Sequence, residues 1–256
     1  MPVRDNKRHP DKNRLFKMAS QTLLFIILVF LIFLIARKNH NLLYLLLFLW
    51  TNSRNFAINF LSAIFLLGTL IHEVSHWITA TLLRVPTGEL SILPKIKDNG
   101  EIQAGKLEIA KTDPFRHALI GLAPMLIGLV LIYLIGRIFF INLSDIFNTK
   151  NLILNTIGGY LLFVITSTMF SSRKDLETMV IALPVMLLVI FMLNYIGVRI
   201  FFDPTLFEKT QKILAELNGY LLICSVVDLF VLIFFQTNIS LWQKILKKNI
   251  ITVKKH

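Results

Sequence analysis

The apolar residues of this chain fall into long blocks that are separated by short polar segments. Several blocks are long enough to cross ~30 Å of hydrocarbon at ~1.5 Å per helical residue. We therefore expect an all-α multi-pass membrane protein with about six transmembrane helices. Their expected positions are residues 19–36, 55–84, 117–136, 151–170, 178–199 and 217–236. The apolar run Asn41–Trp50 is too short to cross, so it is expected to form an interfacial or re-entrant piece before the second span.

The longest polar stretch, roughly residues 85–116, predicts a small β-hairpin directly after the second span. Two partly alternating segments, Leu90–Lys97 and Glu101–Ile109, flank Asp98-Asn99-Gly100. Asn-Gly is a favoured hairpin turn. Two interpretations stay open, because the hairpin is either solvated at the surface or takes part in handling substrate.

The distribution of charge divides the chain into three segments. A basic cytoplasmic N-terminal segment covers residues 1–18, a polytopic membrane domain covers 19–240, and a basic tail covers 241–256. No small-x-small cleavage site follows the first apolar block, which favours a retained anchor over a signal peptide. The tail interleaves apolar residues with lysine, so it either lies on an anionic membrane surface or is a cytoplasmic tail that stabilises topology.

Composition supports the membrane assignment and excludes other classes. Hydrophobic residues make up 55% of the chain, more than the ~45–50% of soluble domains. The net charge is +12, but the 27 Lys and Arg lie between and outside the apolar blocks. We therefore expect a lipid bilayer as the surroundings and no nucleic-acid partner. The single cysteine, Cys224, excludes a disulfide framework and a cysteine-based metal site.

The positions of Lys and Arg also predict an orientation. With the N-terminus inside, six spans place 19 of the 27 basic residues on one face and the other 8 on the opposite face. An excess of Lys and Arg marks the cytoplasmic side. Both termini are therefore predicted to be cytoplasmic, and the cell membrane is the expected location.

Three of the few ionisable residues inside the expected spans form one motif, His72-Glu73-Val74-Ser75-His76. Residues four apart on a helix lie one above the other, so the two imidazoles can bind one tetrahedral zinc ion. Glu73 is turned by about 100° around the helix axis and can accept a proton from an attacking water. Thr69 and Thr79 continue the histidine face as supporting polar residues. The alternative is that neighbouring helices satisfy the motif without metal.

A catalytic zinc needs a third protein ligand, which this helix does not supply. His76 lies eight residues before Arg84, which marks the cytoplasmic interface, so the histidine site is expected ~12 Å below that interface. Asp175 is the best candidate for the third ligand, because six spans place it at the same cytoplasmic face as the histidines. Otherwise Asp175 is an interfacial or helix-capping carboxylate. Glu177 is the weaker alternative as a ligand. Asp228, in the last span, is expected to support the site indirectly or to bond another helix.

A membrane helix with an HExxH motif, a following hairpin and two further spans leading to an Asp motif resembles the site-2 protease family of intramembrane zinc metallopeptidases. The resemblance covers about residues 55–180. It implies one zinc ion per chain, held by His72, His76 and Asp175, with Glu73 as the catalytic residue that activates water.

Two segments depart from the pattern of that family. Its members usually carry Asn-Pro-x-x-Asp-Gly around the third ligand, whereas this chain has Ser172-Arg173-Lys174-Asp175, a Ser-x-x-Asp pattern typical of a divergent branch. Gly121-Leu122-Ala123-Pro124 is similar to the family's Gly/Pro-rich stretch but lacks its Asn. The residue that stabilises the oxyanion is therefore unassigned.

The resemblance implies a zinc endopeptidase that cleaves peptide bonds in or near membrane-spanning segments of substrate proteins. One alternative is another membrane zincin, of the kind that trims prenylated peptides or degrades misfolded membrane proteins. Its usual Glu-x-x-x-Asp helix is not evident after the motif. A second alternative is a non-catalytic metal-binding scaffold. The presence of Glu73, the residue that would activate water, argues against this alternative. The physiological substrate and the oligomeric state do not follow from the sequence.

Overall fold

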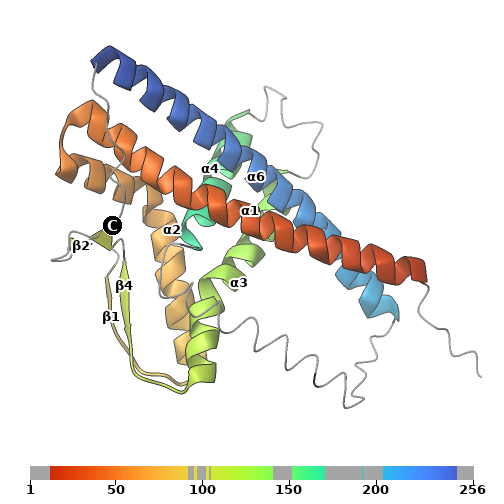
Figure 1. Cartoon of the computed structure of the whole chain (residues 1–256). Helices are drawn as coiled ribbons and strands as arrows, with labels where there is room; N and C mark the ends of the chain where they lie inside the picture. Colours follow the sequence, from red (N-terminus) through yellow and green to blue (C-terminus); the bar gives the residue numbers. More distant parts are fainter. Residues whose placement is uncertain are drawn as a thin grey trace, which may run out of the picture.

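The computed structural model describes residues 12–91, 95–96, 102–103, 105–140, 152–170, 192 and 204–246. Long helices dominate this part of the chain, with two small antiparallel pairs of short strands (Figure 1). The helices are α1 (Lys12–Thr51), α2 (Arg54–Leu82), α3 (Pro114–Phe139), α4 (Leu152–Thr168) and α6 (Pro204–Leu246). The strands are β1 (Thr87–Ser91), β2 (Lys95–Ile96), β3 (Ile102–Gln103) and β4 (Lys106–Ile109).

Four of the described helices are long and apolar enough to cross a membrane. Their spans are Phe16–Thr51, Arg54–Leu82, Pro114–Phe139 and Glu208–Ile245. Helix α4 is apolar but has only 17 residues. The helix expected at 178–199 lies outside the described residues. The helical architecture is therefore confirmed, and the count of six spans stays a prediction.

The first helix is longer than the sequence pattern predicted. Helix α1 runs without interruption through 40 residues. Asn41–Trp50 is thus its C-terminal part, and the prediction of a separate interfacial or re-entrant piece is wrong. The polar residues around Asn39 lower the local hydropathy, but no Gly or Pro is present there to break the helix.

Helices α1 and α6 are the two longest, and they lie side by side in the same direction (Figure 1). Near the start of both helices, Asn218 Nδ2 donates to the Gln21 main-chain oxygen at 3.0 Å. Near their ends, the rings of Trp50 and Trp242 lie 6.5 Å apart. Six alternating spans would make the first and last helices antiparallel, whereas α1 and α6 are parallel. The parallel pair gives no support to the prediction that both termini are cytoplasmic.

The hairpin after the motif helix is confirmed. Strand β1 pairs antiparallel with β4, and β2 pairs antiparallel with β3. The register pairs Lys95 with Gln103 and Ile96 with Ile102, on either side of the expected Asn-Gly turn, which itself lies outside the described residues. The paired strands fold back alongside α2 (Figure 1), and both β1 and β4 contact that helix.

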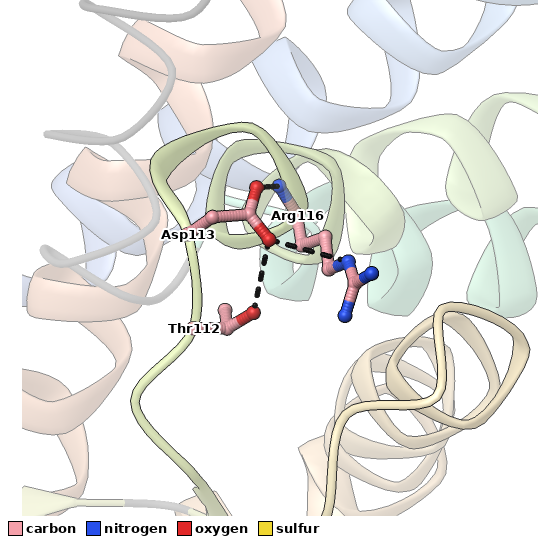
Figure 2. A network of polar contacts seen from close by, with 3 residues as sticks. All are labelled: Thr112, Asp113 and Arg116. Atoms are coloured by element: carbon pink, nitrogen blue, oxygen red, sulfur yellow. Dashed lines mark hydrogen bonds and ion pairs between the residues drawn. The ribbon is translucent and has the colours of Figure 1, made fainter.

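A capped turn leads from the hairpin into α3 (Figure 2). The Asp113 carboxylate accepts a hydrogen bond from the Arg116 main-chain N–H at 3.0 Å and pairs with the Arg116 Nε at 3.2 Å. Thr112 Oγ1 donates to the same carboxylate at 3.4 Å. The Arg116 N–H is the chief reason that the pKa of Asp113 lies below its ordinary value. The charged cap is therefore present at neutral pH and is lost only as the pH falls through that lowered pKa.

Close helix packing surrounds the middle of α2. A Cβ placed on Gly68 would stand 2.5 Å from Thr168 Oγ1 and 2.7 Å from Val164 Cγ1, so only glycine permits this approach of α4. Gly128 gives α3 a similar approach to Met169 at the end of α4. Small residues at such crossings let helix backbones come close in apolar surroundings. As a result, α3 and α4 both pack beside the motif of α2.

Candidate metal centre

The motif lies on the inward face of α2. His72, Glu73 and His76 are 4%, 8% and 6% exposed, so all three are buried. The helix continues without interruption to Leu82, which preserves the spacing of one turn between the two histidines. Burial of three titratable groups in an apolar helix requires a function or a set of polar partners.

The two imidazoles converge on one point. Their Nε2 atoms lie 3.3 Å apart, and the ring planes are at 85° to each other. Two nitrogens bound to one zinc at ~2.0–2.1 Å, with a tetrahedral angle between them, are separated by ~3.3 Å. The separation of these nitrogens therefore fits two ligands of the same zinc ion.

A contact from α3 fixes the tautomer of His76. Its Nδ1 lies 2.8 Å from the Ile120 main-chain oxygen, and a carbonyl only accepts hydrogen bonds, so Nδ1 carries the hydrogen. The neutral ring then has its lone pair on Nε2, the atom that faces His72. Metal-binding histidines usually have their other ring nitrogen anchored in this way.

Pro124 explains why the Ile120 carbonyl is available. In an α-helix the carbonyl of residue 120 would accept from the N–H of residue 124, but proline has no N–H. The free carbonyl instead accepts from His76. Sequence reasoning noted Pro124 only as part of a Gly/Pro-rich stretch and missed Ile120, although the four-residue spacing was the signal that could have identified it.

The hairpin covers Glu73. A Cβ placed on Gly105, just before β4, would stand 2.7 Å from Glu73 Oε1 and 2.9 Å from Thr69 Cγ2. The hairpin backbone thus lies directly against the expected catalytic carboxylate and against Thr69, which is itself buried. At this point the hairpin is packed on the motif helix and is not a solvated surface loop.

A small cavity lies next to His72. Its volume is about 10 Å³, which is room for about one water molecule. Helices α2, α3 and α4 all contribute to its wall, through Gly68, Ile71, His72, Pro124, Gly128, Ile165, Thr168 and Met169. His72 and the C-terminal end of α4 therefore border the same small cavity.

The predicted third ligand cannot be placed, because Asp175 and its alternative Glu177 lie outside the described residues. Within the described ranges, no group of three His, Cys, Asp or Glu side chains is arranged to hold a metal ion. Thr166 Oγ1 of α4 donates a hydrogen bond to Asp228 Oδ1 at 3.2 Å, so Asp228 is bonded to another helix. Thr79 is half-buried one turn beyond His76.

A larger side chain at position 105 should impair the site without removing its metal ligands. We expect Gly105→Val to lower any peptidase activity by about 10- to 100-fold, because the new side chain would displace Glu73 or the hairpin. Zinc content should be unchanged. Gly159→Val is the matched control, since a Cβ on Gly159 meets nothing within 4 Å. Equal activity of the two variants would show that the contact with Glu73 is unimportant.

The chain was compared with known protein families, curated proteins and solved structures. No protein-family model, no curated protein and no solved structure matches the chain.

Proposed function

We propose that the chain is an intramembrane zinc endopeptidase. The observation that carries the proposal is the convergence of His72 Nε2 and His76 Nε2 at 3.3 Å, with buried Glu73 beside them, in a helix able to cross a membrane. The anchored tautomer of His76 supports a metal site over a chance pair of buried histidines. The substrate class is a membrane protein whose cleaved bond lies in or near a spanning segment.

The roles of the residues follow from their chemistry. His72, His76 and Asp175 would hold one zinc ion, which would act as a Lewis acid and make water nucleophilic near neutral pH. Glu73 accepts a proton from the attacking water and returns it to the leaving amine. The neighbouring helices and the hairpin exclude bulk water from the buried carboxylate.

Asp175 remains the proposed third ligand because the end of α4 lies close to the histidines. Met169 and His72 line the same cavity. Asp175 is five residues beyond Phe170, the last described residue of this segment, and five residues span at most ~18 Å. This length of chain is compatible with zinc binding by Asp175.

The hairpin is proposed to bind the substrate backbone. Within the described part of the chain, β1 pairs only with β4, so no other described strand occupies the outer edge of either strand. An unwound substrate segment that adds to one of these edges would be held extended for attack. The contact of Gly105 with Glu73 would bring that segment next to the catalytic carboxylate.

The proposal is tested by metal analysis and by proteolysis with the purified full-length protein. We expect about one zinc per chain and cleavage of a transmembrane reporter that a zinc chelator stops and added zinc restores. The His72→Ala/His76→Ala double variant should lack both properties, whereas His117→Ala, a change at an exposed histidine of α3, should keep both. Wild-type protein without zinc would refute the proposal, and zinc without cleavage would indicate a non-catalytic scaffold.

A further inference from the structure

A second buried polar cluster lies where α1, α4 and α6 meet. Asn39, Thr166 and Asp228 supply one side chain from each helix, and all three are 0% exposed. Asn39 Nδ2 donates to the Asp228 main-chain oxygen at 2.9 Å, and Thr166 Oγ1 lies 3.2 Å from Asp228 Oδ1. These two contacts bring the amide, the hydroxyl and the carboxyl group together inside the helix bundle.

Two oxygens of this cluster lack the partners that buried polar atoms normally have. Asp228 Oδ2 and Asn39 Oδ1 are buried and have no hydrogen-bond partner within the described part of the chain. Both oxygens are strong acceptors, which normally bind a hydrogen-bond donor or a cation. Asn39 is bonded to the main chain of residue 228, so the two unpartnered oxygens belong to two residues in direct contact.

The negative charge of Asp228 also has no visible counter-charge. The basic residues of α1 that follow Ala36 are Arg37, Lys38 and His40. Arg37 and Lys38 are exposed, and the half-buried His40 ring stacks on the Phe65 ring at 4.6 Å. The Arg37 guanidinium lies over the Phe33 ring at 5.6 Å. No ion pair to Asp228 occurs among the described residues. A carboxylate that is fully buried among apolar helices is costly unless a cation neutralises it.

We propose that Asp228, Asn39 and Thr166 form a binding site for a sodium ion, separate from the histidine motif. The atoms that would bind the cation are all oxygens, which favours a hard cation. One carboxylate balances a single positive charge, whereas a divalent ion would leave net charge in the apolar interior. The carboxylate, the Asn39 amide oxygen and the lone pairs of the Thr166 hydroxyl supply the ligands.

Sodium at this position would join three helices and so stabilise the folded protein by mass action. The effect would extend toward the motif, because Thr168, the last residue of α4, and Met169 directly after it line the cavity beside His72. The sodium site does not depend on peptidase activity, so its test can succeed or fail whatever the outcome for the zinc motif.

The test measures thermal unfolding of the full-length protein in detergent, in sodium chloride or choline chloride of equal ionic strength. The melting temperature of the wild type should rise with sodium to a plateau and should not respond to choline. Asp228→Asn, which resembles the neutral acid in shape, should abolish the sodium response. Asn39→Ala keeps the carboxylate and should raise the sodium midpoint by about tenfold or more.

The matched control is Ser225→Ala, which removes a buried hydroxyl of the same helix that is already bonded to the Leu221 carbonyl. It should respond to sodium as the wild type does. Binding of radioactive sodium to the wild type, displaced by sodium chloride and not by choline chloride, tests the site without any variant. An equal sodium response in Asp228→Asn, or wild type stabilised by acid but never by sodium, would overturn the proposal.

Discussion

Glu73→Gln is expected to lower cleavage of a transmembrane reporter by at least about 100-fold, since a positioned general base contributes roughly 10²- to 10⁴-fold. Glutamine keeps the size and much of the polarity of the side chain but cannot accept the proton of an attacking water. The side chain is buried and lies against Gly105, so the isosteric change should not disturb packing. The measurement is the initial cleavage rate of purified variant and wild type at equal zinc content.

The zinc content of Glu73→Gln should match that of the wild type, because Glu73 is not one of the three proposed zinc ligands. Glu216→Gln is the control for loss of a carboxylate. Glu216 accepts a hydrogen bond from Tyr133 at 2.9 Å, between α6 and α3, and has no part in the proposed chemistry. If Glu73→Gln cleaved as fast as the control, Glu73 would not be the base. If it lost its zinc, Glu73 would act as a ligand.

The local features of the site could be predicted from the sequence because they depend on short spacings. The interval from His72 to His76 is one helical turn, so the convergence of two imidazoles needed only a continuous helix. The Asn-Gly pair predicted the hairpin because its turn requirement is local. The anchor of His76 was also encoded locally, in the spacing between Ile120 and Pro124.

The relations between distant elements could not be read in the same way. Hydropathy predicted the apolar blocks but not the continuity of α1. A polar residue such as Asn39 lowers the local hydropathy, and only the structure shows that it is bonded to Asp228 of α6. The contact of Gly105 with Glu73 depends on the hairpin folding back along α2, which no local pattern specifies. The parallel arrangement of α1 and α6 likewise depends on the path of the chain between them.

Asp175→Ala is expected to remove most of the zinc from the purified protein. Catalytic zinc sites usually have three protein ligands, and the described residues supply two, His72 and His76. Loss of one of three ligands weakens binding strongly, because the remaining pair no longer fixes the geometry of the ion. The measurement is zinc per chain after extensive dialysis, together with the cleavage rate before and after zinc is added back.

Glu177→Ala is the matched control, since it removes a neighbouring carboxylate from the same segment. Retention of zinc by this variant and its loss from Asp175→Ala would identify Asp175 as the ligand. The reverse pattern would assign the ligand to Glu177, and retention by both variants would exclude Asp175. If Asp175→Ala lost zinc while its unfolding temperature stayed close to that of zinc-free wild type, the loss would result from the missing ligand and not from misfolding.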